Sequence, residues 1–215
     1  MLASGPLGPP EGPSDVPPAT GIVLAGGRSS RLGKDKALLS LPDGRPLVAH
    51  VVARLAPLVA EVVVVATDGE RLGPLPARVV PDVFPDGGAL GGIYAGLAAA
   101  REEYSLVVAC DMPLLRHRLL RHLLAQPRDF DVLLPRLAGG QVEPLHAIYS
   151  RACLEPIRRQ LAAGRYRIVS FLGDVRVRYV EEAELRRLDP ELRSFFNVNT
   201  PADLAALPQL LQEVG

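Results

Sequence analysis

Residues 20–37 read TGIVLAGGRSSRLGKDKA. The first six are a short apolar, β-branched run ended by two glycines, which is typical of a buried strand that leads into a loop. Because glycine lets backbone N–H groups approach an anion and cationic side chains add positive charge, the stretch predicts a phosphate-binding loop after a central strand. Its four cations are Arg28, Arg31, Lys34 and Lys36.

The spacing of this loop differs from that of two familiar phosphate-binding loops. A P-loop has four residues between its glycines and then Lys-Ser or Lys-Thr, whereas five residues separate Gly27 from Gly33 here and Lys34-Asp35 follows. The dinucleotide-binding pattern GxGxxG is also absent. Only two of the 24 basic residues are lysines, and both lie in this loop. This concentration indicates a specific function for lysine there. The alternative is an exposed basic loop that binds nothing.

Further apolar runs alternate with helical patterns along the chain. The runs up to residue 135 are apolar on both faces, so we expect buried parallel strands that right-handed helical crossovers connect, which is a doubly wound, mostly parallel α/β sheet. The run 175–181 alternates and has one polar face. The predicted strands are 20–25, 61–66, 77–81, 105–110, 130–135, 140–149 and 175–181. The predicted helices are 46–55, 91–103, 116–125 and 150–163, and a last helix with Thr200 as N-cap and Pro201 at its first position.

Length and composition predict one globular domain with a tail. The chain has 215 residues, of which 48% are hydrophobic and 22% charged, and neither a repeat nor a proline-rich linker divides it after residue 20. Six prolines fall within residues 1–18, so we expect a disordered tail there and a domain over 19–215.

Charge and cysteine content exclude several classes of function. The formal net charge is zero, which removes the electrostatic basis for a general nucleic-acid or membrane-surface binder. No apolar run reaches the length of a membrane span, and the first residues lack the pattern of a signal peptide. The two cysteines, Cys110 and Cys153, have no metal-type spacing, so the expected compartment is the cytoplasm.

Two carboxylates follow predicted strands. Asp111 comes directly after strand 105–110, and ligands of open α/β sheets bind at the carboxyl ends of the strands. A carboxylate beside a polyphosphate needs a bridging cation, so Asp111 predicts a Mg²⁺ site, with a helix N-cap as the alternative. Asp82 precedes the glycine-rich loop FPDGGALGG and predicts a contact with a base or ribose, or a tight turn.

The segment FFNVNTP places Asn197 and Asn199 on one face of an extended stretch. Their amides could reach a second substrate or a metal-bound water, and turn or cap chemistry is the alternative. The histidines share no motif spacing, and those on predicted helices, His50, His117 and His122, are expected at the surface. Cys110 is expected to be a small core residue.

Five motifs in order, LAGGRSSRLGKDKALL, VVPD, GGALGG, CDMP and FNVNTPADL, closely resemble those of the molybdenum cofactor guanylyltransferase family. They span about residues 20–205. The resemblance implies a nucleotide-diphospho-sugar-transferase type of fold and the Mg²⁺-dependent transfer of GMP from GTP to molybdopterin, with release of pyrophosphate. A protein partner that delivers molybdopterin or accepts the product is also conceivable.

The resemblance also implies roles for individual residues. Asp111 would hold Mg²⁺. The chemistry of the cationic loop and of the metal site predicts, independently of the resemblance, that Asp111, Lys36 and Arg31 act in catalysis. Nucleotide contacts would come from Leu24, Ala25, Gly26, Lys36, Asp82 and Asp111.

Two positions depart from the family pattern. Several members carry an asparagine that contacts the nucleotide where this chain has Val65, and a proline is usual where it reads Gly88-Ala89-Leu90. The base contact at Val65 is therefore in doubt. Two alternatives share the same loop: a related nucleotidyltransferase that uses CTP on molybdopterin or a nucleotide on a sugar phosphate, and a GTP-binding module without activity.

Overall fold

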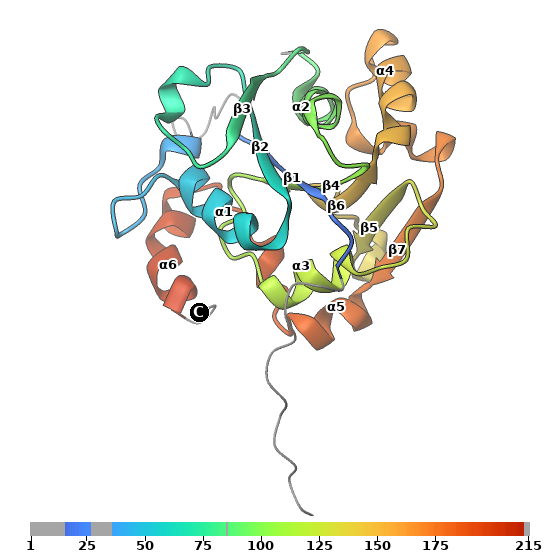
Figure 1. Ribbon diagram of the computed structural model, residues 1–215. Coiled ribbons are helices and arrows are strands. Elements are labelled where there is room, and N and C mark those ends of the chain that lie inside the picture. The colour runs from blue at the N-terminus through green and yellow to red at the C-terminus, as the bar shows by residue number, and fades with distance from the viewer. Residues whose placement is uncertain (1–15, 27–35, 85, 213–215) are drawn as a thin grey trace, which may run out of the picture.

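The computed structural model describes residues 16–26, 36–84 and 86–212. Within these residues seven strands form one sheet in the order β3-β2-β1-β4-β6-β5-β7 (Figure 1). The strands are β1 Thr20–Leu24, β2 Glu61–Ala66, β3 Arg78–Pro81, β4 Tyr104–Ala109, β5 Val132–Arg136, β6 His146–Ser150 and β7 Val177–Glu181.

The sheet is mostly parallel, as predicted, but β6 runs against both of its neighbours. β6 pairs antiparallel with β4 and β5, whereas the other four pairings are parallel. The connection between β5 and β6, residues 137–145, is too short for a helical crossover, and an antiparallel return is the arrangement that a short connection permits. The strand that was expected over 140–149 is therefore shorter: it begins at His146 and ends at Ser150.

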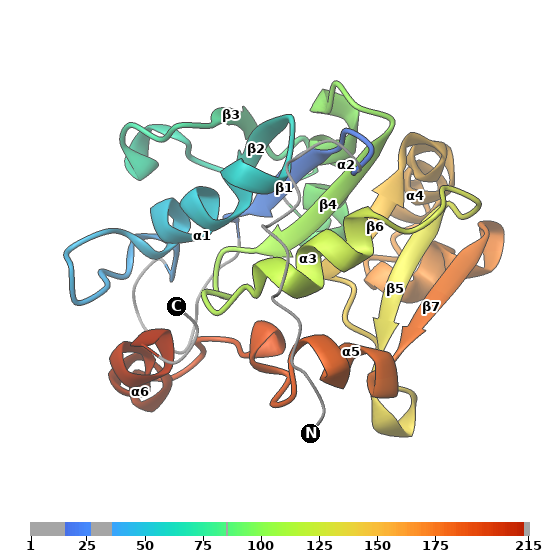
Figure 2. The same cartoon turned by 60° about the horizontal axis from the view of Figure 1, so that its bottom comes forward.

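Helices cover both faces of the sheet (Figures 1 and 2). Residues of β1 alternate between two cores: Val23 belongs to the core that includes residues of α1, α3 and α5, while Ile22 belongs to the core that includes residues of α2 and α4. This confirms the doubly wound prediction. The helices are α1 Leu47–Leu55, α2 Gly88–Ala99, α3 His117–Leu124, α4 Leu154–Ala162, α5 Glu182–Leu188 and α6 Pro201–Gln212.

The last helix, α6, begins as predicted. Thr200 Oγ1 accepts the N–H of Asp203, and the Asp203 carboxylate accepts the Thr200 N–H, which is a reciprocal cap. The helix buries only Leu207 fully and contains Pro208 in its interior. Leu207 joins a small core with residues before and in α1 and after β4, which brings the start of α6 to the carboxyl edge of the sheet.

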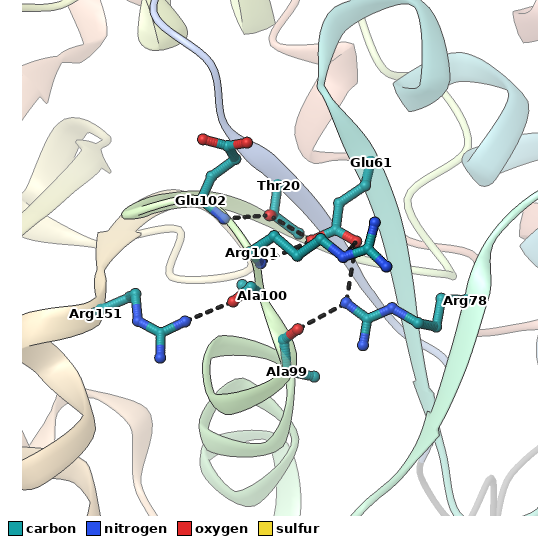
Figure 3. A network of polar contacts seen from close by, with 8 residues as sticks. All are labelled: Thr20, Glu61, Arg78, Ala99, Ala100, Arg101, Glu102 and Arg151. Atoms are coloured by element: carbon teal, nitrogen blue, oxygen red, sulfur yellow. Dashed lines mark hydrogen bonds and ion pairs between the residues drawn. The ribbon is translucent and has the colours of Figure 1, made fainter.

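At the opposite edge, where β1 and β2 begin, Glu61 gathers several donors (Figure 3). Its carboxylate accepts hydrogen bonds from the Thr20 hydroxyl at 3.1 Å, the Arg78 guanidinium at 3.0 Å and the Arg101 N–H at 2.8 Å. Arg78 also donates to the carbonyl of Ala99 at the end of α2. Glu61 therefore ties three strands and a helix together at the edge away from the predicted ligand loop.

The structure describes only part of the predicted N-terminal tail. Residues 1–15 of the predicted tail lie outside the described residues, while Val16 packs against the core that contains α1, so the extent of a tail stays a prediction. No helix in the described part of the chain combines the length and the apolar character needed to cross a membrane.

Candidate functional site

The carboxyl ends of four neighbouring strands are level with one another. Leu24 of β1 lies opposite Val65 of β2 and Ala109 of β4, and Ala66 lies opposite Pro81 of β3. The residues that follow these strands therefore meet at one edge. Hydrogen bonds extend the pairing by one residue, from Ala25 N to Val65 O at 2.8 Å and from Cys110 N to Leu24 O at 3.0 Å.

At this edge Lys36 contacts two side chains that lie far away in the sequence. Its Nζ atom is 2.9 Å from Oδ2 of Asp111 and 2.6 Å from Oδ1 of Asn199. The Lys36 and Asp111 side chains are 21% and 18% exposed, so the ion pair is partly buried. The structure thus brings together a residue of the glycine-rich segment, a residue after β4 and a residue before α6.

Backbone contacts fix the two oxygen-bearing partners of Lys36. The N–H of Val198 donates to the carbonyl of Asp111 at 2.9 Å, which joins the segment before α6 to the segment after β4. The N–H of Asn199 donates to the carboxylate of Asp203 in the first turn of α6. Asn199 is therefore held between the sheet edge and a capped helix.

Asn197 does not reach Lys36. Its Nδ2 atom donates to the carbonyl of Phe195 at 3.0 Å, so its side chain stabilises its own segment. The two asparagines therefore differ in their contacts: the Asn197 side chain bonds within its own segment, whereas the Asn199 side chain contacts Lys36.

A divalent cation could bind at the Asp111 carboxylate, which is in direct contact with Lys36. Among the described residues no group of three or more His, Cys, Asp and Glu side chains could hold a metal ion. Asp111 Oδ2 accepts Lys36, and a carboxylate has a second oxygen to offer. One carboxylate suits Mg²⁺, which keeps several waters and takes further ligands from substrate phosphates.

Asp82 lies at the same edge but is engaged in a turn. Its Oδ1 atom accepts the N–H of Phe84 at 2.9 Å, as the turn alternative requires. A Cβ on Gly91 would lie 2.6 Å from the Phe84 carbonyl and 3.4 Å from Asp82 Oδ1, so only glycine lets α2 pack this closely. The glycine-rich stretch thereby sets the position of Asp82.

The predicted contacts of Leu24, Ala25 and Gly26 fall at the end of β1. Leu24 and Ala25 are buried, whereas Gly26 is exposed. Val65 is 2% exposed and packs in the core with α2, and its carbonyl already accepts the Ala25 N–H. Arg28, Arg31 and Lys34 lie outside the described residues.

The histidines do not form a site with Lys36. The expectation of a surface position is wrong for His50, which is buried and donates from Nε2 to the Pro113 carbonyl at 3.0 Å, because α1 packs this face on the segment after Asp111. Burial lowers the pKa values of His50 and His117. His146 is fully buried, and burial lowers its pKa to about 4. Cys110 is buried, as expected.

Comparisons with known proteins identify a family. Residues 21–178 match the family described as a MobA-like NTP transferase domain. A protein of Pelotomaculum thermopropionicum named probable molybdenum cofactor guanylyltransferase is 44% identical over 190 residues, which is 86% of this chain and 90% of that protein. A molybdenum cofactor guanylyltransferase of Desulfosudis oleivorans is 40% identical, over 86% and 92% of the two chains.

Solved structures give the same fold. Molybdopterin-guanine dinucleotide biosynthesis protein A of Archaeoglobus fulgidus superposes with a TM-score of 0.78 at 29% identity, over 90% of this chain and 99% of that one. A cytidylyltransferase acting on 2-C-methyl-D-erythritol 4-phosphate, from Thermus thermophilus, reaches a TM-score of 0.61 at 21% identity over 92% and 98%, which is a likeness of fold alone. The predicted nucleotide-diphospho-sugar-transferase type of fold is confirmed.

Proposed function

The chain belongs to the MobA-like NTP transferase family, a family of nucleotidyltransferases, and on that premise we propose that it transfers GMP from GTP to molybdopterin. The products are pyrophosphate and the molybdopterin guanine dinucleotide cofactor. The observation that carries the proposal is the meeting of Lys36, Asp111 and Asn199 at the carboxyl edge of the sheet. An ammonium, a carboxylate and an amide in direct contact suit the transfer of a nucleotidyl group.

In this reaction the terminal phosphate of molybdopterin attacks the α-phosphorus of GTP, and the bond to the departing pyrophosphate breaks in line. A phosphate monoester is already anionic near neutral pH, so no strong general base is required. The absence of a histidine from the contacts of Lys36 fits such a mechanism. Asp111 would hold Mg²⁺, which supplies positive charge that neutralises oxygens of the α-phosphate and of the leaving pyrophosphate.

Lys36 contributes a second, fixed positive charge. Its ammonium, 2.9 Å from Asp111 and 2.6 Å from Asn199, is a compact donor that can bind a phosphate oxygen. Asn199 would orient this ammonium and the acceptor phosphate. Arg31 would add charge for the leaving group from the glycine-rich loop.

The base would be read by backbone groups at the end of β1, between Leu24 and Gly26, other than the Leu24 carbonyl and the Ala25 N–H, which the sheet already pairs. Asp82 lies nearby. Guanine offers the N1–H and N2–H donors and the O6 acceptor together. A different base would leave buried polar groups unpaired, at a cost of about 1 to 3 kcal/mol for each group. A marked preference for GTP over CTP, ATP and UTP follows.

The test is the release of pyrophosphate with each nucleotide in the presence of molybdopterin and Mg²⁺. We expect the rate with GTP to exceed the rates with the other three. A rate with CTP equal to or above that with GTP would point to the cytidylyl alternative, and GTP binding without pyrophosphate release would point to a module without activity. A sugar phosphate in place of molybdopterin tests the remaining acceptor.

We also place the reaction in the cytoplasm and expect neither nucleic acid nor a membrane as a partner. Both cysteines are buried, and two cysteines are too few for a disulfide scaffold, which suits a reducing compartment. Molybdopterin could arrive on a delivering protein, and comparing free with protein-bound molybdopterin as acceptor would test that step.

A further inference from the structure

A buried carboxylate lies outside the contacts of Lys36, at the end of α5. Asp189 is completely buried. Its Oδ2 atom accepts the N–H of Ser194 at 2.7 Å, and its Oδ1 atom lies 3.6 Å from Nε of Arg116. The hydroxyl of Ser194, also buried, accepts the N–H of Arg116 at 3.1 Å. Asp189, Ser194 and Arg116 thus form one polar cluster beneath the surface.

This cluster connects the two segments that carry the partners of Lys36. Residues 111–116 begin with Asp111 and end with Arg116, and residues 194–199 begin with Ser194 and end with Asn199. The segments are joined near both ends, by the hydrogen bond from Val198 to Asp111 and by that from Arg116 to Ser194. Asp189 contacts both residues of the second joint, Ser194 and Arg116, so it fixes how the two segments lie against each other.

The chain adopts a costly conformation to make this connection. Leu192 has φ +54°, and it is the one non-glycine residue with a positive φ in the part of the chain that the structure describes. Its N–H donates to the Asp189 carbonyl at 2.9 Å, which closes a turn that returns Ser194 to the Asp189 carboxylate. A leucine in the left-handed region is unfavourable and persists where surrounding contacts determine it.

The buried charge of Asp189 has a cationic neighbour in Arg116 and a neutral one in His146. Removing a carboxylate from water is unfavourable unless charge and hydrogen bonds compensate for it. Burial lowers the pKa of His146 to about 4, so its ring is uncharged near neutral pH. The ring packs edge-on against Phe195, with centroids 4.9 Å apart, directly after Ser194. Apolar side chains could fill this space, but they would not accept the Ser194 N–H.

We propose that Asp189 is a positioning residue for the transfer reaction. Through Ser194 and Arg116 it holds Asn199 and Asp111 at the spacing in which both contact the ammonium of Lys36. The inference rests on the proposed function, because it concerns the geometry of the same reacting groups. It adds a residue that touches neither nucleotide nor acceptor and acts through two backbone segments.

The test compares variants of this cluster with a matched control. Asp189→Ala removes both contacts, Asp189→Asn keeps an oxygen for the Ser194 N–H but loses the charge opposite Arg116, and Ser194→Ala removes the hydroxyl alone. Glu61→Ala is the control, because Glu61 is also a carboxylate that ties several elements together, but at the opposite edge of the sheet (Figure 3). All of these variants are expected to lower Tm.

Kinetics separate positioning from stability. At a temperature where every variant is folded, we expect Asp189→Ala to lower kcat for GMP transfer by roughly tenfold or more, since small misplacements of reacting groups have large effects on rate. Asp189→Asn and Ser194→Ala should fall between Asp189→Ala and the unaltered chain, and the KM for GTP should change little. Glu61→Ala should keep both constants. If Asp189→Ala does not fold, the two milder variants still decide the question.

A readout without turnover uses the fact that Lys34 and Lys36 are the only lysines. In protein labelled with ¹³Cε-lysine, an NMR spectrum contains two lysine signals, and Lys36→Arg identifies the one from Lys36. We expect Asp189→Ala to shift that signal and Glu61→Ala to leave it in place.

The outcomes distinguish this inference from the proposed function. An unchanged Lys36 signal together with unchanged kcat in all three cluster variants would overturn the positioning role. If the unaltered protein releases no pyrophosphate from GTP, the proposed function is wrong, and the lysine spectrum still reports whether Asp189 holds Asn199 and Asp111 on Lys36.

Discussion

At the scale of single residues, the geometry makes Lys36 sensitive to the shape of its cation. An ammonium fits between Asp111 and Asn199, at 2.9 and 2.6 Å, whereas a planar guanidinium is broader and needs a different approach. We expect Lys36→Arg to reduce kcat/KM for GTP by roughly tenfold although the charge is kept. Lys36→Met should reduce it further. Steady-state kinetics measure both, and an unchanged kcat/KM in Lys36→Arg would contradict a specific role of the ammonium.

Asp111→Asn is expected to remove most turnover and to leave the fold intact. The amide has the same shape and keeps an oxygen for Lys36, but it loses the charge that holds a divalent cation. A loss of kcat on the order of 10² to 10³ is typical when such electrostatic stabilisation is removed. The measurements are turnover in saturating Mg²⁺ and Tm, with Asp129→Asn as an exposed control. Near-normal turnover of Asp111→Asn would refute the metal assignment.

The sequence indicated some of these residues and not others, for a physical reason. Lys36 and Asp111 carry local signals: a rare lysine in a glycine-rich loop, and a carboxylate directly after an apolar run. Asp189 carries none, because its role depends on contacts with Arg116 and Ser194 that only the folded chain creates. The same holds for the different contacts of Asn197 and Asn199, which have the same side chain and lie two residues apart.

At the scale of elements, prediction worked best where burial is complete. β2 spans the expected residues because its side chains are apolar on both faces. The helix expected at 91–103 begins at Gly88 instead and ends at Ala99, since glycines needed for close packing disguise its start. The helix α5 was missed, because a helix of seven residues directly after a strand gives little periodic signal.

The packing of α2 on β1 gives a prediction of its own. A Cβ on Gly96 would lie 2.5 Å from Cγ2 of Ile22, so Gly96→Ala must push the helix away from the strand. We expect a loss of about 1 to 3 kcal/mol in the free energy of unfolding, the usual effect of overpacking a core. Gly173→Ala is the matched control, because no atom lies within 4 Å of its added Cβ. Urea denaturation measures both, and equal stabilities would contradict the close approach.

At the scale of the whole molecule, one buried ring shapes the dependence of stability on pH. The pKa of His146 is about 4 in the folded protein and near 6.5 in the unfolded chain. Between these values the unfolded chain binds a proton that the folded protein does not. Protonation of His146 therefore leaves the free energy of unfolding unaffected above pH 6.5 and lowers it as pH falls towards 4. The decline attributable to His146 is about 3 kcal/mol.

The variant His146→Gln isolates this effect, because glutamine does not titrate. We expect its free energy of unfolding to fall less steeply than that of the unaltered protein between pH 6.5 and 4. The two curves should run parallel from pH 7.5 to 9, where the imidazole is neutral in both states. Parallel curves at acidic pH would mean that His146 is protonated in the folded protein.

Because α6 is weakly attached, the protein should lose activity on warming at a lower temperature than the one at which it unfolds as a whole. This helix buries only Leu207 fully, and Pro208 interrupts its hydrogen bonding, yet the residue before its cap, Asn199, is a partner of Lys36. Segments with little buried surface open locally at a much smaller cost than the whole protein unfolds. Each such opening would disconnect Asn199 while the sheet stays intact. On warming, the fraction of molecules in which Asn199 contacts Lys36 should therefore decline before cooperative unfolding begins, and cooling should restore it. The attachment of α6 would then set the temperature optimum of the reaction.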